Sequence, residues 1–505
     1  MAKPRKIQPP FPIVANYPGF LERTSYRLYN YIFNSLYPIN PVVFGASTAA
    51  FAAYFSRNDR IRSLFPQLAF KHAEYVRIGL ASLLSSYIPV FVSRLILTQF
   101  YFKYKGFMSE NPKKPSLVTK IWAMIGTALN AVTKPRLLSC DNLLPSPSVP
   151  PLEQTIKSYL QSLEHIHTKE EMEELNLLAK EFLNGEGRKL QRYARFYSLF
   201  VDNYVTNFWE KFAYLCGRDG LLINSSVAHG GFFEGFPATQ AVMAANTVYV
   251  EALTALAIDR QTFPPMADEI IRCYDNYSTE RDDLDLVTLI FNDWGKGRIK
   301  KCGVSPDAFV QMAIQLTQFK DQGRFVHTYE PTSARFYRNS RTETLRSVTA
   351  ESCAFVNAML DPSTTLEDRV SLLKKAAELH VSHSKDSMLN KGADRHLFVL
   401  FVLSKVLGVS SPFLNRFVQQ EWLLSTSNLP NMTNSMREDE EPQRSWIGGC
   451  FAAVAKTGYG VCYRFAGDHS ICIHVTSYHS AENTSSSRFM QRLSESLREI
   501  SELFD

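Results

Sequence analysis

Two apolar stretches near the N-terminus constrain this chain most, because each approaches the length of a membrane span. Residues 41–55 are apolar, and adding residues 36–40 brings the stretch to the roughly 20 residues that a transmembrane helix needs. Residues 78–102 form the second stretch, which contains Pro89 and Arg94. An arginine near the end of a span can extend its charged group to the membrane interface. We therefore predict two membrane helices; a buried helical hairpin in a soluble protein is the alternative.

Charge does not orient these stretches in a membrane. Basic residues precede the first stretch and also occupy the loop between the two, so the Lys and Arg bias that marks the cytoplasmic side does not decide the matter. No apolar region follows the first basic residues, as a secretory signal would require. The first 21 residues contain five prolines, which argues against an amphipathic transit helix.

The composition is that of an ordinary globular protein. Hydrophobic residues make up 45% of the chain and charged residues 21%, which supplies enough apolar material for a sizeable core. The net charge of +6 suits a membrane surface or acidic ligands and does not indicate nucleic acid as a partner. The eight cysteines lack CxxC pairs and zinc-type spacing, so we expect reduced thiols in a cytosol-facing protein and predict no metal site.

Beyond residue 108 the pattern is mainly helical at first and mixed later. Residues 109–116 are polar and contain proline, which indicates a linker, and residues 143–151, rich in Pro and Ser, are predicted to be a further extended segment. Thr168 is a plausible N-cap, and Ser305 with Pro306 marks a second helix start. The predicted helices are 152–163, 170–183, 197–215, 238–258, 306–319, 366–383, 395–407 and 486–503. The predicted strands are 325–328 and a hairpin of 459–465 with 470–477.

A motif in the second half carries most of the functional information. Residues 329–335 read Tyr-Glu-Pro-Thr-Ser-Ala-Arg, and residues 341–344 follow with Arg-Thr-Glu-Thr. This combination resembles the carnitine-binding signature of the carnitine/choline acyltransferases, and most closely that of the outer-membrane, type 1 carnitine palmitoyltransferases. Further matching motifs lie at residues 295–301, 305–309, 392–397 and 425–427.

The resemblance implies two groups of binding residues. Those matching the family's carnitine-binding positions are Tyr329, Thr342, Arg395, Ser425 and Phe451. An arginine fork suits a carboxylate because it bonds both oxygens, and an aromatic face stabilises a trimethylammonium group. An ion pair with Asp394 or another nearby acid is the alternative role for the arginine, and core packing is the alternative for the phenylalanine.

The resemblance also implies a CoA site. Lys296 and Lys300 match the lysines that hold the CoA phosphates, and Asp307 lies in the adjoining motif. Flexible basic residues before a helix N-terminus make a good phosphate site, whereas a lone lysine run is more often solvated surface. Ser427 matches a hydroxyl that donates to the developing oxyanion.

The family's general base is missing from the pattern. None of the eleven histidines lies in the HxxxDxP motif that supplies it, and the insert that carries the motif is absent between about residues 265 and 269. A carnitine hydroxyl is a poor nucleophile until a base takes its proton, and such a base contributes on the order of 10²–10⁴-fold. His327, two residues before Tyr329, is a weak substitute; a packed strand histidine is the alternative. Two further departures are Asn428 and the Ala452-Ala453 pair.

We therefore expect an α/β fold with four parts. The resemblance implies a C-terminal domain of the CoA-dependent acyltransferase type, with a mixed sheet and helices, and a truncated, mainly helical N-terminal domain. The expected parts are a tail and anchor at 1–107 with spans at about 36–55 and 78–102, a linker at 108–150, the truncated domain at 151–285 and the C-terminal domain at 286–505.

Two functions follow as hypotheses. The first is transfer of long-chain acyl groups from acyl-CoA to carnitine at the mitochondrial outer membrane, with the soluble part facing the cytosol; the endoplasmic reticulum is the alternative location. The second is a non-catalytic CoA- and carnitine-binding or regulatory form that pairs with a full-length relative. Neither requires a permanently bound cofactor. The exposed surface left by the missing segment favours a homo- or hetero-oligomer.

Overall fold

The structure is a computed structural model of the 505-residue chain. It describes residues 20–58, 73–133, 139–215, 278–279, 281–429 and 449–505. The predicted helix at 238–258 and the position of the missing insert lie outside these residues. The described residues divide into two compact units, those up to Pro145 and those from Ser146 on, and each unit is described by itself.

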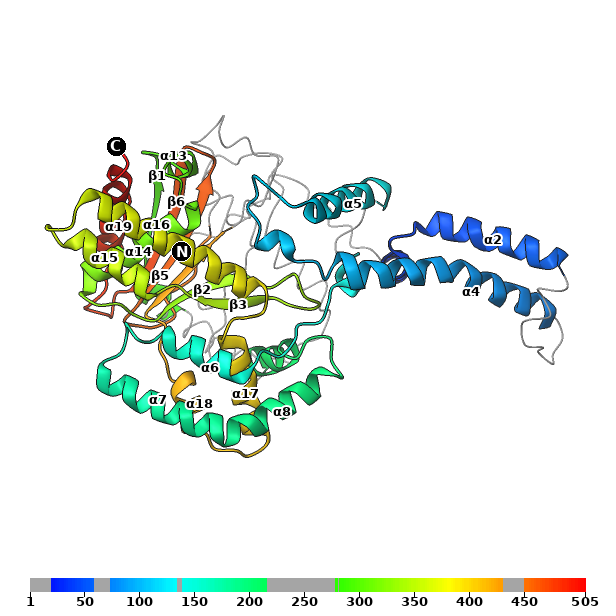
Figure 1. The fold of residues 1–505 in the computed structure, drawn as a ribbon, viewed down its shortest axis with the longest axis horizontal. Helices are drawn as coiled ribbons and strands as arrows, with labels where there is room; N and C mark the ends of the chain where they lie inside the picture. The colour runs from blue at the N-terminus through cyan, green and yellow to red at the C-terminus, as the bar shows by residue number, and fades with distance from the viewer. Residues whose placement is uncertain (1–19, 59–72, 134–138, 216–277, 280, 430–448) are drawn as a thin grey trace, which may run out of the picture. The chain divides into compact units, whose positions relative to one another are not determined.

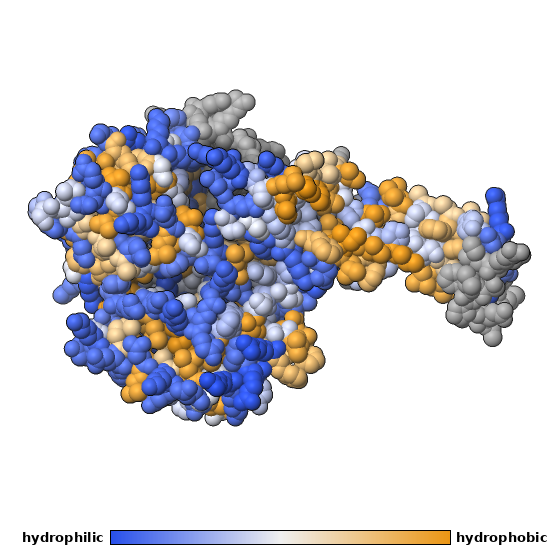
Figure 2. Space-filling model, in the orientation of Figure 1, coloured by the Kyte–Doolittle hydropathy of each residue, from blue (hydrophilic) through white to orange (hydrophobic). Residues whose placement is uncertain are grey.

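The first unit is helical. It contains α1 (Phe20–Leu36), α2 (Pro41–Arg57), α4 (Ala73–Ile96), a π-helical turn (Leu97–Tyr101), α5 (Leu117–Thr133) and two short 3₁₀ turns (Gly106–Met108 and Asp141–Leu143). Helices α2 and α4 lie side by side, and both present large apolar areas (Figures 1 and 2).

One of the two predicted spans has the length and composition to cross a membrane. The segment Glu74–Met108 meets that description within the described residues, and it contains the predicted stretch 78–102. The prediction for 36–55 is not supported in the same way, because the chain turns between α1 and α2 and leaves α2 with only 17 residues.

Arg94 contacts the end of α1. Its guanidinium donates to the backbone carbonyls of Asn34, Ser35 and Tyr37 at 3.0, 3.1 and 3.0 Å. These carbonyls lie at the C-terminal end of α1, where backbone acceptors lack helical partners and where a cation is stabilised. Arg94 therefore joins α4 to the end of α1.

Part of the predicted linker at 108–150 is helical. Helix α5 is apolar and begins after Ser116, whose hydroxyl accepts from the Thr119 backbone N–H at 3.2 Å. The linker prediction followed the polar, proline-containing residues before this cap and missed the apolar residues after it.

The second unit begins with a layer of helices. These are α6 (Leu152–Gln161), α7 (Lys169–Asn184), α8 (Glu186–Ser198), α9 (Thr206–Trp209) with a π turn (Glu210–Leu215), α17 (Asp394–Val406) and α18 (Pro412–Val418). They share one apolar core, and Figure 1 shows them grouped beside the β2–β3 end of the sheet. Thr168 forms the predicted cap of α7, as a capping box with Glu171.

The predicted helix 197–215 is interrupted. Helix α8 ends at Ser198, and the next helix, α9, begins at Thr206. The side chain of Asn203 accepts from the backbone N–H groups of Val205 and Thr206 at 2.9 and 3.3 Å, and it thus holds the turn that leads into the new helix. The aromatic pattern continues through this break, which is why the sequence suggested a single helix.

A six-stranded mixed sheet forms the centre of the second unit. Its strands are β1 (Leu284–Phe291), β2 (Thr328–Ser333), β3 (Thr342–Arg346), β4 (Leu424–Asn428), β5 (Tyr459–Ala466) and β6 (Ser470–Tyr478). The order is β1-β6-β5-β4-β2-β3, with parallel pairs β2–β4 and β4–β5 and antiparallel pairs elsewhere. The predicted hairpin is confirmed as β5–β6. The predicted strand 325–328 is wrong, because the strand starts at Thr328 and continues to Ser333.

Four longer helices pack with the sheet around a second core, next to one short helix. The four are α14 (Pro306–Gln322), α15 (Ala350–Leu360), α16 (Leu366–Met388) and α19 (Ser486–Glu502), and the short one is α13 (Lys296–Lys301). Ser305 and Pro306 start α14 as predicted. Helix α19 buries the predicted face of Phe489, Leu493, Leu497 and Ile500. This α/β core places β2, β3 and β4 next to one another.

Candidate functional site

Arg395 and Thr342, predicted separately, are in contact. Arg395 is the second residue of α17, and its Nε donates to the Thr342 carbonyl at 2.9 Å, while a terminal nitrogen lies 3.2 Å from the Thr342 hydroxyl. The Trp209 ring lies 4.0 Å from the guanidinium carbon. Of the five N–H groups of an arginine, these two bonds occupy two, so three remain for a ligand.

Glu343 lies buried beneath this pair. Its carboxylate accepts from the backbone N–H groups of Thr344 and Arg395 at 2.8 and 3.1 Å. Burial raises the pKa of Glu343 to about 7, although the Arg395 charge opposes the change. Gly392 leaves room for this carboxyl, since a Cβ there would lie 2.3 Å from the Glu343 Cγ. The carboxyl thus fixes the first turn of α17.

Asp394 pairs with Arg346, so it is not the partner of Arg395 that the alternative role named first. The nearby acid of Arg395 is Glu343. Arg346 makes two hydrogen bonds to the carboxylate, at 2.9 and 2.8 Å, and both side chains are buried. The Arg346 guanidinium also lies 4.6 Å from the Trp422 ring centroid. Trp422 contacts the predicted Tyr329 edge to face, with the centroids 5.5 Å apart.

His327 is buried. Its ring lies 5.1 Å from that of His167 and 6.2 Å from that of Trp422, and its Nδ1 has no hydrogen-bond partner among the described residues. Burial first, and then the charges of Arg346 and His167, lower the pKa of His327 to about 3. It is therefore neutral near pH 7 and only weakly basic.

The predicted Ser425 and Ser427 lie on β4. Ser425 is the register partner of Tyr329, so these two predicted residues are neighbours across the β2–β4 pair. Thr426, the residue between Ser425 and Ser427 on β4, donates its hydroxyl to the Tyr329 carbonyl at 3.0 Å. Ser427 is half-buried and pairs with Cys462 of β5.

Phe451 reaches the sheet from a connecting segment. Its carbonyl accepts from the Thr476 hydroxyl at 2.8 Å, which places the segment against β6. Phe451 is thus positioned by β6, whereas Arg395 and Thr342 belong to α17 and β3.

Asp307 lies in the first turn of α14 and accepts three hydrogen bonds. The donors are Tyr463 at 2.6 Å, Asn428 at 2.8 Å and the His380 ring at 3.3 Å. The His380 nitrogen also lies 3.6 Å from the carboxylate of Glu330, the residue after Tyr329. Asn428, a departure from the family pattern, thus links β4 to Asp307.

His380 carries a proton between the two carboxylates. Burial lowers its pKa, but Glu330 and Asp307 outweigh that effect and raise it to about 10. One possible metal-ligand atom from each of Asp307, Glu330 and His380 lies within 4.8 Å of the other two. Within the described residues, these three groups are therefore close enough together to hold a metal ion. The His380 ring is hydrogen-bonded to Asp307 and lies beside Glu330, whose pKa is raised by burial, so the geometry does not require an ion.

The two predicted lysines lie on α13. Gly297 donates its N–H to the Asp468 carbonyl at 3.2 Å, which holds this short helix against the β5–β6 turn. Lys300 is exposed and lies 3.9 Å from the Asp468 carboxylate, while Lys296 is half-buried. The solvated position of Lys300 leaves its ammonium accessible to a phosphate. The structure brings neither lysine into contact with the Arg395 group.

Sequence reasoning missed three buried groups of this region. Glu330 and Glu343 stand inside the motifs quoted for the resemblance, but their burial gave no signal in the sequence. His380 lies in a predicted helix with nothing nearby in the sequence to mark it, because its partners come from α14 and β2.

Comparison with known proteins gives a consistent result. The family model described as choline/carnitine O-acyltransferase matches residues 147–279 and 266–495. The chain is 46% identical over 224 residues to the muscle isoform of carnitine O-palmitoyltransferase 1 from Homo sapiens and 45% identical to the human liver isoform. It is 30% identical over 244 residues to carnitine O-acetyltransferase from Columba livia.

These matches cover part of each protein. They span 44% of this chain and 29% of either human palmitoyltransferase, and 48% of this chain and 37% of the acetyltransferase.

Proposed function

The chain belongs to the choline/carnitine O-acyltransferase family, and on that premise we propose that it binds carnitine near Arg395 and a CoA thioester near Lys296 and Lys300. The observation that carries the proposal is the Arg395–Thr342 contact. It fixes the guanidinium and leaves three N–H groups for a carboxylate. Tyr329 and Ser425 are neighbours on β2 and β4, and the β2–β3 register places Tyr329 opposite Arg346, at the other end of the ladder from Thr342.

The reaction class is acyl transfer from a thioester to a hydroxyl. The carnitine oxygen forms a bond to the acyl carbon, the carbon–sulfur bond of acyl-CoA breaks, and the hydroxyl proton ends on the CoA sulfur. Ser427 would donate to the oxyanion that forms at the acyl carbonyl. The names of the similar palmitoyltransferases favour a long-chain acyl group.

We expect weak turnover by this chain alone. No histidine lies in the HxxxDxP motif. His327 has a pKa of about 3, far below the range in which a side chain removes protons efficiently near pH 7. His380 is already protonated between two carboxylates.

The missing base favours a second candidate function. In this form the chain binds CoA and carnitine without catalysing transfer, and it acts by pairing with a full-length relative. The membrane location is proposed for both functions: the mitochondrial outer membrane with the second unit facing the cytosol, or alternatively the endoplasmic reticulum. The segment Glu74–Met108 supports a membrane location and does not distinguish the two.

Calorimetry on the full chain in detergent micelles tests the binding proposal. Carnitine should bind the parent chain, and Arg395→Ala should weaken it by about tenfold or more, since a hydrogen bond to a charged group is worth about 1.5–3 kcal/mol. Lys405→Ala, on the same helix, is the matched control. Equal carnitine affinity in the parent and Arg395→Ala would refute the assignment.

Activity separates the two candidate functions. The assay is carnitine-dependent release of CoA from palmitoyl-CoA by membranes that contain only this chain. Turnover lost in Arg395→Ala would support catalysis and show that another base exists. Carnitine binding without turnover would support the non-catalytic form.

A further inference from the structure

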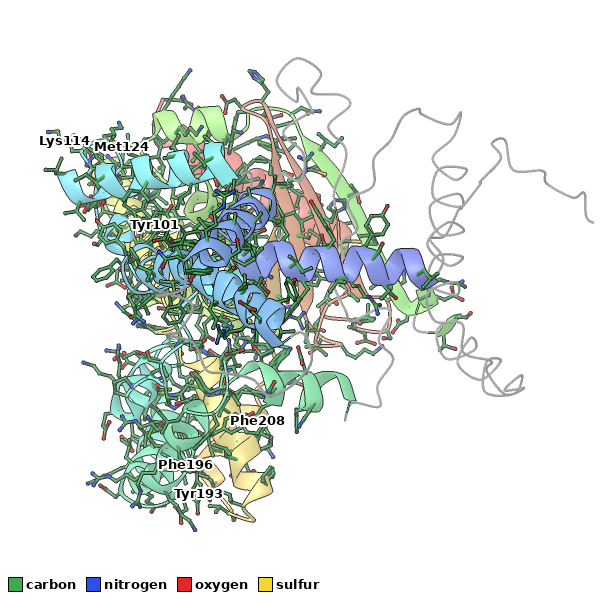
Figure 3. All side chains as sticks on the ribbon, turned by 90° about the vertical axis from the view of Figure 1, so that its right-hand side faces the viewer. Tyr101, Lys114, Met124, Tyr193, Phe196 and Phe208 are labelled. Carbon is green, nitrogen blue, oxygen red and sulfur yellow. The ribbon has the colours of Figure 1, made fainter. Side chains whose placement is uncertain are left out.

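Helix α8 presents an unusual outer face. Its inner face, Gly187, Leu190, Gln191 and Ala194, is buried against the helical layer. The outer face carries Lys189, Arg192, Tyr193 and Phe196, and Figure 3 labels the last two. A helix turns once in 3.6 residues, so these four side chains form a continuous stripe along the solvent side.

The stripe continues past the end of the helix as exposed apolar residues. Phe196 is 62% exposed, Leu199 76% and Phe200 72%. The Phe196 and Phe200 rings contact each other edge to face, with centroids 5.0 Å apart. In Figure 2 orange surface lies next to deep blue surface near this end of α8. Isolated exposed apolar residues are ordinary, but a contiguous group indicates a contact surface.

The charge of α8 is strongly basic. Arg188, Lys189, Arg192 and Arg195 oppose a single acid, Glu186, which gives a net charge of +3 on the helix. No ion pair within the described residues neutralises these four basic groups. Lys189 and Arg192 also line a shallow hollow of about 390 Å³ together with Tyr193 and Phe196.

We propose that the outer face of α8 docks on an anionic lipid surface. Aromatic and aliphatic side chains next to Lys and Arg are the composition of interfacial helices, in which rings enter the headgroup region and basic groups meet lipid phosphates. Tyr193 has the ring and hydroxyl of a residue suited to that boundary. The hollow between Lys189 and Arg192 has space for a phosphate headgroup.

A membrane is favoured as the occupant because the chain carries its own candidate span. If Glu74–Met108 is inserted, the second unit remains tethered near the bilayer, so even a weak surface is engaged at a high effective concentration. This argument rests on the proposed membrane location and is independent of carnitine and CoA binding.

The neighbouring helix α7 is acidic where α8 is basic. It carries five acids, Glu170, Glu171, Glu173, Glu174 and Glu181, and one exposed leucine, Leu177, at 58%. An anionic surface should repel α7 and attract α8. Leu177 is therefore a matched control position for Phe196.

The test uses the full chain reconstituted in vesicles that contain brominated lipid. Phe196→Trp and Leu177→Trp each add one tryptophan to the parent, and quenching of the added emission reports lipid contact. We expect quenching for Phe196→Trp in phosphatidylserine-containing vesicles, less in pure phosphatidylcholine, and none above the parent for Leu177→Trp. High salt should reduce the quenching because surface charges are screened.

A charge reversal completes the test. Lys189→Glu with Arg192→Glu, in the Phe196→Trp background, should lower the contact population by roughly tenfold or more, since each basic residue near such a surface contributes appreciably. Flotation with the vesicles measures anchoring separately from α8 contact. Anchored chain with no quenching at position 196, or with equal quenching at positions 177 and 196, would overturn the proposal.

Discussion

Arg346 and Asp394 are joined by two hydrogen bonds of 2.9 and 2.8 Å in a buried site, with the guanidinium over the rings of Trp422 and Tyr159. The pair connects the end of β3 to the first turn of α17. Because Asp394 precedes Arg395, the pair also sets where the proposed carnitine-binding guanidinium lies. Arg346 and Asp394 therefore position Arg395, the residue that would contact carnitine, without contacting carnitine themselves.

Removing one member of this pair should be more damaging than removing both. Arg346→Met or Asp394→Leu alone leaves an uncompensated buried charge, and we expect each to lower the free energy of unfolding by about 3–5 kcal/mol. The double variant should lose less than either single variant. Urea unfolding of the four proteins, followed by tryptophan fluorescence, gives the comparison; additive losses would show that the pair is not coupled.

The lysines of α13 should control CoA affinity. Lys296→Ala with Lys300→Ala removes two phosphate-binding charges, and we expect roughly tenfold weaker CoA binding in calorimetry. The control is Lys374→Ala with Lys375→Ala, two exposed lysines of α16. Unchanged CoA affinity in the α13 double variant would remove the assignment without affecting the carnitine proposal.

Glu343 should make stability depend on pH. Its pKa in the folded chain, about 7, lies above its ordinary value of 4.5, so the folded state binds this proton more tightly than the unfolded state. The resulting stabilisation is full below about pH 4.5 and is lost as the pH rises through 7; the upper limit is about 3 kcal/mol.

Glu343→Gln keeps an acceptor for the two backbone N–H groups and removes the titration. The difference in free energy of unfolding between parent and variant, measured from pH 4.5 to 8, should therefore change in favour of the variant and level off above pH 7. A difference that stays constant over this range would contradict the raised pKa.

His327 should not be the base of any residual turnover. A ring with a pKa of about 3 has little tendency to take a proton from an alcohol. We expect His327→Gln to leave residual carnitine-dependent CoA release within about twofold of the parent, with thermal melting as the check on folding. A loss approaching the range typical of general-base removal, about 10²-fold or more, would identify His327 as a substitute base.

Local sequence patterns predicted several elements correctly. Thr168 and Glu171 are three residues apart, so the cap they form could be predicted from their spacing. The face of Phe489, Leu493, Leu497 and Ile500 on α19, and the β5–β6 hairpin, follow from helical and strand periodicity. The break after Ser198 was missed because an aromatic-rich run continues through it. The continuation of β2 to Ser333 was missed because Pro331 interrupts the strand pattern.

The sequence by itself determined the family and the identities of the candidate binding residues, because these reside in short motifs of fixed spacing. Only the tertiary structure decided that Asp394 pairs with Arg346, that Glu343 is buried under Arg395, and that His380 lies between Asp307 and Glu330. These partners are far apart in the chain, and their protonation depends on burial and on charges brought together by folding. Neither burial nor such proximity is encoded in any local run of residues.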